Sequence, residues 1–342
     1  MTAKRWKRRP DGSNWGDFGP DDQIGRLNLI TRERRRRALA EAREGHVFCL
    51  SLPLDFPGGN YHNLGRRPPR LHPVQKDGRV KYNLRANARH TDVFCDDTVE
   101  LSLQFSTQWD ALAHVGTTFD ADGDGEAEIV YYNGYRGGVD IAPPAAASAG
   151  DEGQPFAGAR ALGIENMAAS CVQGRGVMVD LFNHFGRPRT IVGYDELMGV
   201  MEKDKVLVEA GDMLCLHTGQ ASALLAMTRD PDHETLENAF SHLDGCDDRL
   251  LQWIDDAGVS VIAADNFAIE AVPPSAVREG RPYEGLHDRC IVKLGIHLGE
   301  LWHLGPLNDW LRKNGRNRFL LTAPPLRLPG AVGSPVTPVA TV

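Results

Sequence analysis

The sequence predicts an α/β fold built around one main hydrophobic core. From residue 171 onward, short apolar runs that end in polar residues alternate with helical segments. The runs are 176–181 (GVMVDL), 213–217 (MLCLH) and 259–264 (VSVIAA), and the helical segments are 195–203 and 250–257. This alternation is typical of a parallel sheet covered by helices. The chain has 342 residues, 42% of them hydrophobic, which is enough to bury a sizeable core.

Composition narrows the classes of function. A formal net charge of −8 gives no overall attraction to nucleic acid or to anionic lipid. No apolar run approaches the roughly 20 residues that a membrane helix needs. The basic N-terminal residues 4–9 are not followed by the hydrophobic segment of a signal peptide, so we expect a cytoplasmic protein. Six cysteines lie far apart without a CxxC pair, which indicates reduced thiols rather than a zinc ribbon.

The N-terminal part is expected to be an arm. Residues 14–31 are rich in Gly and Asp and predict an ordered, turn-rich segment. Thr31 caps a predicted helix that runs to about Glu44, and 47–54 alternates like a strand. We therefore divide the chain into an N-terminal arm with the first helix, 1–40, and one main domain, 41–342. The proline-rich, basic stretch 58–87 is expected to cover the substrate, because it precedes the segment described next.

Residues 101–116, LSLQFSTQWDALAHVG, carry the most informative pattern. Apolar and polar residues alternate through position 110, which predicts a strand with one polar face that includes Gln104, Gln108 and Asp110. A water-facing strand is one interpretation. The polar side chains of this stretch are hydroxyls, amides and a single carboxylate, without Lys or Glu. This composition favours the interpretation that the polar face lines a site. His114 follows Asp110 by four residues, so a helical turn or short loop could bring both to one substrate.

The same stretch resembles a family motif. Bacterial kynurenine formamidases, isatin hydrolases and the wider cyclase family of metal-dependent hydrolases carry H-x-G-T-H-x-D-x-P-x-H, and QFSTQWDALAH is similar to it. Thr107, Asp110 and His114 match the motif, whereas Gln104 and Gln108 stand where the family has two metal-binding histidines. The chain most resembles the branch with Q-W-D in place of the histidine motif.

Further blocks extend the resemblance from about residue 14 to residue 340. They include N-W-G near the start, Tyr132-Asn133-Gly134, GRGVMVDL, GDMLCLHTG, AADNFAIE, the block that begins at Leu286-His287, and Gly333-Ser334-Pro335. The resemblance implies a single-domain swivelling β/β/α cyclase-like fold. It also implies a homodimer or higher homo-oligomer.

The resemblance further implies a metal site. Its ligands would be Asp110, His287 and Glu300, with amide oxygens from Gln104 and Gln108. His297 and His303 are rival candidates for the place of His287. The metal would be Mn²⁺ or Zn²⁺, and the two amide oxygens shift the preference towards harder ions such as Mn²⁺ or Mg²⁺. His114 would be the catalytic acid and base. We expect three residues of the Q-W-D and Y-N-G blocks to bind substrate: Trp109, Tyr132 and Asn133.

These expectations lead to two hypotheses about function. The first is a hydrolase that cleaves an amide, formamide, lactam or lactone of a small molecule with a metal-activated water. The sequence has no phosphate-binding loop, no GxGxxG after a strand and no GxSxG, which disfavours nucleotide enzymes and serine esterases. The second is a non-catalytic small-molecule binder that lost its metal together with the two histidines.

Residues 120–125 (DADGDG) open like a calcium-binding loop. The twelfth position of that loop would be Tyr131 rather than the expected Glu, and no helical pattern flanks it. The sequence is compatible with two interpretations of this loop, a calcium site and a plain acidic turn.

Overall fold

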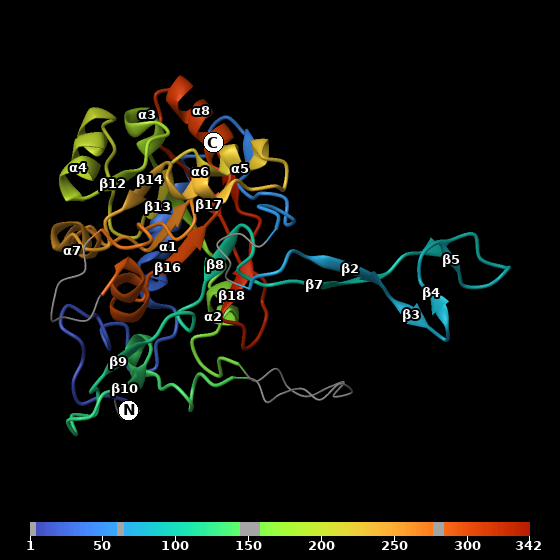
Figure 1. The fold of residues 1–342 in the computed structure, drawn as a ribbon, viewed down its shortest axis with the longest axis horizontal. Helices are drawn as coiled ribbons and strands as arrows, with labels where there is room; N and C mark the ends of the chain where they lie inside the picture. The colour runs from blue at the N-terminus through green and yellow to red at the C-terminus, as the bar shows by residue number, and fades with distance from the viewer. Residues whose placement is uncertain (1–4, 60–64, 144–157, 276–283) are drawn as a thin grey trace.

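A mixed nine-stranded sheet forms the centre of the protein, whose computed structural model describes residues 5–59, 65–143, 158–275 and 284–342 (Figure 1). Four parallel neighbours occupy the middle, and antiparallel strands extend the sheet on both sides. In spatial order the strands are β1 (Val47–Cys49), β19 (Val339–Thr341), β17 (Arg318–Thr322), β11 (Gln173–Asp180), β13 (Met213–His217), β15 (Val261–Ala264), β16 (His297–Glu300), β8 (Gln108–Asp110) and β18 (Gly333–Pro335).

Helices cover both faces of this sheet. Alternate residues of a strand point to opposite faces, so Val177, Leu214 and Ile262 pack with α4 and α7 on one face. Met178, Met213 and Val261 pack with α8 on the other. The helical elements are η1 (Gly25–Leu29), α1 (Arg32–Leu39), η3 (Tyr132–Gly134), α2 (Ile164–Ala169), α3 (Leu181–Phe185), α4 (Tyr194–Lys203), α5 (Gln220–Ala226), α6 (His233–Glu237), α7 (Asp248–Asp256), the π-helix η4 (Asp288–Lys293) and α8 (Gly305–Lys313).

The predicted α/β class is confirmed by this arrangement. Strand β13 has the predicted bounds, and α4 begins one residue before its predicted start. Helix α1 begins after Thr31, whose hydroxyl accepts a hydrogen bond from the Arg34 amide, but it ends at Leu39 rather than near Glu44. The predicted strand 47–54 is reduced to β1, because only its first three residues pair with β19.

The strand predicted for 101–110 is wrong for its first seven residues. Only Gln108–Asp110 pairs, because its neighbour β18 supplies just three partners. Upstream, the Phe105 amide donates to the Ser102 carbonyl in a turn. The alternation in this stretch therefore reflects turns packed against the body and not an extended strand.

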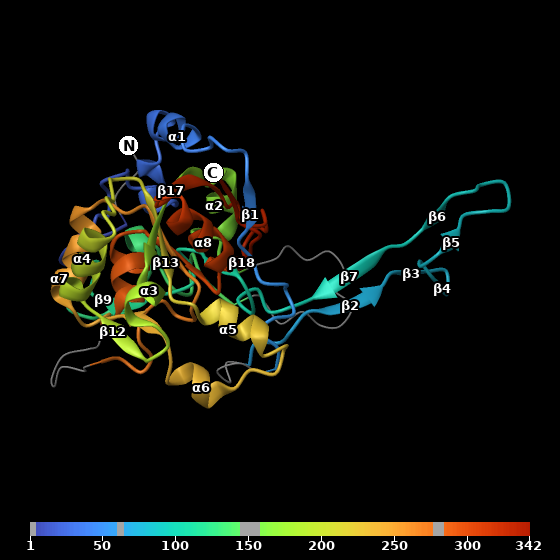
Figure 2. The same cartoon turned by 90° about the horizontal axis from the view of Figure 1, so that it is seen from above.

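Residues 66–102 form a long antiparallel hairpin that projects from the body (Figures 1 and 2). We call this hairpin the arm; it is distinct from the N-terminal segment 1–40. The prediction that 58–87 covers the substrate is not met by residues 70–87, since they lead away from the body. Residues 60–64 lie outside the described residues. The hairpin consists of β2 (Arg70–Pro73) with β7 (Asp97–Glu100), β3 (Gln75–Lys76) with β4 (Arg79–Val80), and β5 (Leu84–Arg85) with β6 (Val93–Phe94).

The N-terminal segment lies against the main core. Trp15 is buried, and its indole nitrogen donates to the Val292 carbonyl at 2.7 Å. The Asn14 side chain donates to the Leu294 carbonyl at 2.8 Å. These contacts fix the segment beside η4, which begins directly after His287.

Two other expectations concern the whole chain. All six cysteines are free thiols. Among the described residues, no helix combines the length and the apolar character needed to span a bilayer.

Candidate metal centre

The pairing of β8 brings distant polar residues together. In the register with β16, Gln108 lies opposite Glu300. Directly opposed residues project to the same face, and the Gln108 amide nitrogen donates to Glu300 Oε2 at 3.2 Å. Asp110, two residues further along β8, shares that face. The sequence positions 108, 110 and 300 thus meet because β8 is inserted between β16 and β18.

His287 completes a cluster with these carboxylates. One ligand atom each from Asp110, His287 and Glu300 lie within 4.8 Å of one another. His287 Nε2 is 3.4 Å from Glu300 Oε1. The structure therefore gathers three of the five predicted metal ligands at one point, although 190 positions separate the first from the last in the sequence.

Glu270 orients His287 through the ring nitrogen that faces away from Glu300. Its Oε1 atom lies 2.6 Å from His287 Nδ1 and also accepts the His287 backbone amide. A second-layer carboxylate of this kind fixes the tautomer and direction of a metal-binding imidazole. Sequence reasoning missed Glu270, although it closes the block AADNFAIE. The available signal was its place as the last residue of that block.

The cluster contains oxygen atoms that have no donor. Both carboxylate oxygens of Asp110 and the Oε1 atom of Gln108 are buried and lack a hydrogen-bond partner among the described residues. Burying unpaired acceptors is costly, whereas a divalent cation would satisfy all of them. Two carboxylates, an imidazole and an amide oxygen form a donor set that suits such an ion. The residues present therefore fit a metal ion.

Electrostatics inside the cluster are strongly perturbed. Burial, and then the charge of Glu300, raises the pKa of Asp110, although His114 and His287 oppose this. Burial alone would lower the pKa of His287, but the hydrogen bonds that it donates to Glu270 and Glu300 outweigh burial and raise the pKa to about 10. The protonated imidazole is thus the counter-charge of the carboxylates, and binding a cation there requires loss of the Nε2 proton.

His114 stands between this cluster and the surface. Its Nε2 atom is 3.7 Å from Asp110 Oδ1, and 23% of its side chain is exposed. A tight turn, closed by the His114 amide on the Ala111 carbonyl, places it directly after β8. Its position gives it access both to the buried carboxylate and to a small molecule arriving from outside.

A cavity of about 570 Å³ borders the cluster through His287. Volumes of this size suit small organic ligands. Strands β9 (Thr117–Phe119) and β10 (Glu128–Val130) form one wall, and the start of η4 forms another. The lining residues are Val115, Gly116, Thr117, Thr118, Ile129, Tyr131, Glu270, Gly285, His287 and Asp288.

Gln104 lies on the same side of the sheet as Asp110. A Cβ atom placed on Gly333, the residue opposite Asp110, would be 2.4 Å from Gln104 Nε2. The Gln104 amide nitrogen is buried without a hydrogen-bond partner among the described residues. Its role as a fifth ligand stays a prediction.

We expected Trp109, Tyr132 and Asn133 to bind substrate. In the structure they contact other parts of the chain instead. Trp109 points to the opposite face of β8, where its indole donates to the Ala323 carbonyl at 2.8 Å. The Tyr132 hydroxyl donates to Asp22 at 3.2 Å. The Asn133 amide donates to the backbone of the N-terminal segment, including Gly19 at 3.0 Å. All three are fully buried, so their contacts support structural roles and do not support substrate binding.

The rival histidines lie elsewhere. His297 Nδ1 bonds the Asp110 carbonyl at 2.9 Å, and burial lowers its pKa to about 4, which keeps it neutral. It shares the face of Gly299, beside Trp109, because the two are alternate residues of β16. The His303 amide donates to the Leu50 carbonyl. Neither belongs to the group formed by Asp110, His287 and Glu300.

The acidic loop 120–125 joins β9 to β10 and has no flanking EF-hand helices. Asp120 Oδ1 accepts the backbone amides of Gly123 and Asp124, at 2.7 and 3.1 Å. Arg8 pairs with the other Asp120 oxygen at 2.9 Å. These bonds are those of an acidic turn, and calcium binding there stays untested.

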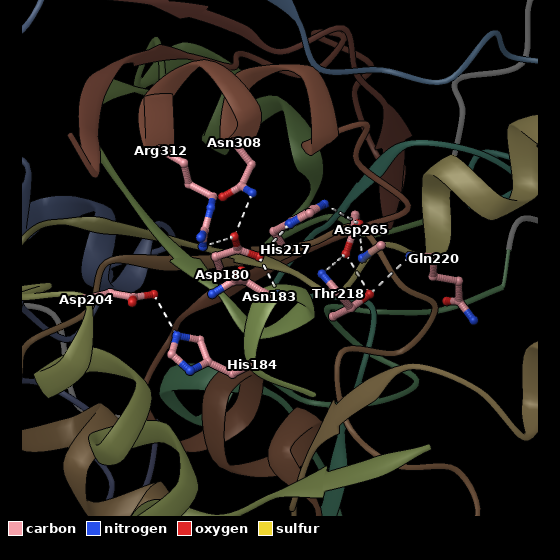
Figure 3. Close-up of polar contacts among 11 residues, drawn as sticks. Asp180, Asn183, His184, Asp204, His217, Thr218, Gln220, Asp265, Asn308 and Arg312 are labelled. Atoms are coloured by element: carbon pink, nitrogen blue, oxygen red, sulfur yellow. Dashed lines mark hydrogen bonds and ion pairs between the residues drawn. The ribbon is translucent and has the colours of Figure 1, made fainter. Parts of the chain in front are cut away.

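A second polar cluster lies at the carboxyl ends of the central parallel strands (Figure 3). His217 at the end of β13 stands between Asp180 at the end of β11, 2.9 Å from Nδ1, and Asp265 after β15, 3.9 Å from Nε2. Asp180 also accepts bonds from Asn308 and Arg312 of α8, both at 2.8 Å. Asp265 accepts hydrogen bonds from Thr218 and Gly219, so both carboxylates have hydrogen-bond partners. We therefore interpret this cluster as a structural contact that holds α8 on the sheet.

Asp180→Asn should strongly destabilise the protein. Breaking a buried ion pair leaves His217 and Arg312 without their counter-charge, at a cost of about 3–5 kcal/mol in the free energy of unfolding. Denaturant unfolding measures this. Asp195→Asn, which removes an exposed partner of Arg249, is the matched control and should cause no measurable change. An unchanged midpoint for Asp180→Asn would contradict the structural role.

The cluster of Asp180 and His217 also predicts that the stability of the protein depends on pH. Burial alone would raise the pKa of Asp180, but bonds from His217 and Asn308 hold it well below its usual value. The pKa of His217 is raised by Asp180 and Asp265 against the effect of burial. The Asp180 contribution is lost as pH falls below about 4, and the His217 contribution is lost as pH rises above about 6.5. The pair therefore stabilises most between these values.

Comparisons with known proteins agree with the geometry. A family model described as "Putative cyclase" matches residues 49–271. A crystal structure of a novel cyclase is 32% identical, covers 96% of this chain and 99% of that chain, and superposes with a TM-score of 0.75. Isatin hydrolase A from Labrenzia aggregata, bound to benzyl benzoate, is 13% identical over 87% of this chain and 93% of that chain, with a TM-score of 0.53.

An isatin hydrolase bound to the product analogue thioisatinate is 11% identical over 90% of this chain and 95% of that chain, with a TM-score of 0.54. At these identities the two isatin hydrolases show a shared fold. No curated protein matches the chain.

Proposed function

Since this chain belongs to the cyclase family and has the single-domain α/β fold of that family, we propose that it is a metal-dependent hydrolase of a small organic amide, formamide, lactam or lactone. The observation that carries this proposal is the buried group Asp110, His287 and Glu300, with acceptor oxygens that have no donor among the described residues.

Asp110, His287 and Glu300 would hold the ion, with the Gln108 amide oxygen beside them. A bound divalent ion would lower the pKa of water and polarise the scissile carbonyl. The oxygen-rich donor set favours Mn²⁺ over Zn²⁺. Glu270 keeps His287 Nε2 directed at the cluster through its own bond to Nδ1.

His114 would move the proton. An imidazole can accept a proton from water and return it to the leaving group. The side chain lies 3.7 Å from Asp110, and Val115, the next residue, lines the cavity of about 570 Å³. A substrate in that cavity would contact His287 and Val115, the residue next to His114.

Metal analysis combined with a hydrolysis screen tests the proposal. Freshly purified protein should contain about one Mn²⁺ or Zn²⁺ per chain, and the loaded protein should cleave at least one member of a panel of formanilides, lactams, lactones and cyclic imides. The alternative, a binder that lost its metal together with the two histidines, predicts no bound metal and no turnover, with retained affinity for small molecules.

We further propose that the arm mediates a homo-oligomer. Its apolar side chains Leu71, Val93 and Val99 are 69%, 54% and 49% exposed. An isolated two-stranded hairpin is only marginally stable in water. Eight Lys and Arg against five Asp and Glu give the arm a net charge of +3, which leaves −11 for the rest of the chain. A second copy of the chain thus offers a surface of complementary charge, and a two-fold axis would make the contact reciprocal.

Replacing the apolar pair on the arm should dissociate the oligomer. Leu71 and Val99 are opposed in the β2–β7 register, so the double variant Leu71→Ser, Val99→Ser removes both from one face. Light scattering after size exclusion should give at least twice 37.6 kDa for the native chain and 37.6 kDa for the variant. A monomeric native chain, or an unchanged variant, would contradict the assignment.

A further inference from the structure

Asp288 is an acidic group in the cavity that the proposed chemistry does not use. It follows His287 and begins η4, a six-residue π-helix. π-Helices are rare and often occur at functional sites. Asp288 lines the cavity next to His287, and the described lining contains no lysine or arginine.

The Asp288 carboxylate is hydrogen-bonded by the Thr117 side chain, but one of its oxygens remains unpaired within the described part of the chain. Its Oδ1 atom is buried without a hydrogen-bond partner among the described residues. The nearby cations of η4 bind other carboxylates: Lys293 pairs with Glu284 at 2.6 Å, and Arg289 lies 4.0 Å from Asp255. Glu270, the other carboxylate of the cavity, is bonded to His287. Asp288 is therefore the cavity carboxylate with an acceptor atom to spare.

We propose that Asp288 is the specificity-determining residue that receives an N–H group or a cationic nitrogen of the substrate. The inference rests on the proposed function, because it places the scissile carbonyl at the metal cluster and the nitrogen at Asp288. The remaining walls include Val115, Ile129 and Tyr131, whose apolar and aromatic surfaces suit a flat ring. The substrate class is thus a small aromatic or heterocyclic molecule with an N–H donor.

A series of three probes of equal size tests this assignment by isothermal titration calorimetry. Benzamidine carries a charged set of N–H donors, benzamide carries a neutral pair, and acetophenone has none. The affinity should fall in that order, with benzamidine at least 10-fold tighter than acetophenone. A buried acceptor left unpaired by the wrong ligand accounts for a difference of this size. Equal affinities, or the reverse order, would overturn the inference.

Asp288→Asn keeps the shape of the side chain and removes its charge. The variant should bind benzamidine with a 10- to 100-fold lower affinity, and its affinity for acetophenone should change by less than 2-fold. Thermal unfolding confirms that the variant is folded. Asp256→Asn, which changes an exposed carboxylate at the end of α7, should leave all three affinities unchanged. A benzamidine affinity that Asp288→Asn does not alter would overturn the assignment.

The titrations are made on both metal-loaded and metal-free protein, because the Asp288 contact does not need the ion. Loss of the benzamidine preference in a protein that still takes up one metal ion per chain rejects the role of Asp288 alone. Failure of metal uptake with the preference intact rejects the proposed function and leaves Asp288 as a binding residue.

Discussion

Asp110→Asn should abolish metal uptake and hydrolysis together. Asp110 is fully buried, and neither of its oxygens has a hydrogen-bond partner among the described residues. The change replaces one anionic oxygen by an amide nitrogen, which cannot bind a cation, and it removes one of the two carboxylate ligands. We expect the bound metal to fall from about one ion per chain to less than a tenth of that.

Asp124→Asn is the matched control for this change. Asp124 belongs to the second cluster of possible metal ligands found among the described residues, in the loop between β9 and β10. Its replacement should leave metal content and turnover unchanged. If Asp124→Asn removes the metal and Asp110→Asn does not, the ion is bound in the loop and the proposed centre is wrong.

His114→Ala should lower kcat by roughly 10²–10⁴-fold, which is the usual cost of losing a general acid and base. The metal content should be retained, because His114 is not one of the three clustered ligands. Melting temperature should also be retained, since the side chain is partly exposed. Kinetics, metal analysis and thermal unfolding are measured on the same preparation.

A structural His114 would give the opposite pattern. The variant would melt at a lower temperature, while the surviving folded fraction would keep its turnover number. His303→Ala provides the comparison, because His303 is half-buried and lies outside the metal cluster. A loss of turnover in His303→Ala with none in His114→Ala would contradict the acid–base role of His114.

The metal cluster was accessible from sequence because its residues belong to recognisable blocks. Asp110 follows from the Q-W-D stretch, while His287 and Glu300 follow from the late block that begins at Leu286-His287. Glu270 also closes a recognisable block, AADNFAIE, but nothing in that block marks it as a partner of His287. Its contact with His287 depends on how the segment after β15 folds back beside η4, and a lone acidic residue does not encode that arrangement.

Other differences arise from interactions at long range in sequence. Residues 101–107 have the alternation of a strand, but the strand partners end with the short β18. The arm likewise has ordinary strand composition, and no local feature indicates that it leaves the body. Trp109 is instructive, because the period of two places it opposite to Gln108 and Asp110. The same rule that joined Gln108 to Asp110 thus predicts the buried packing of Trp109 against Trp302.

Anomalous diffraction from crystals grown with Mn²⁺ tests the central claim most directly. We expect one strong peak between Asp110, His287 and Glu300, with carboxylate oxygens and His287 Nε2 at about 2.0–2.3 Å from the ion. The same data distinguish Mn²⁺ from Zn²⁺ by their absorption edges. Crystals whose only peak lies at the loop 120–125, or that show no peak at saturating Mn²⁺, would contradict the claim that this cluster is a metal centre.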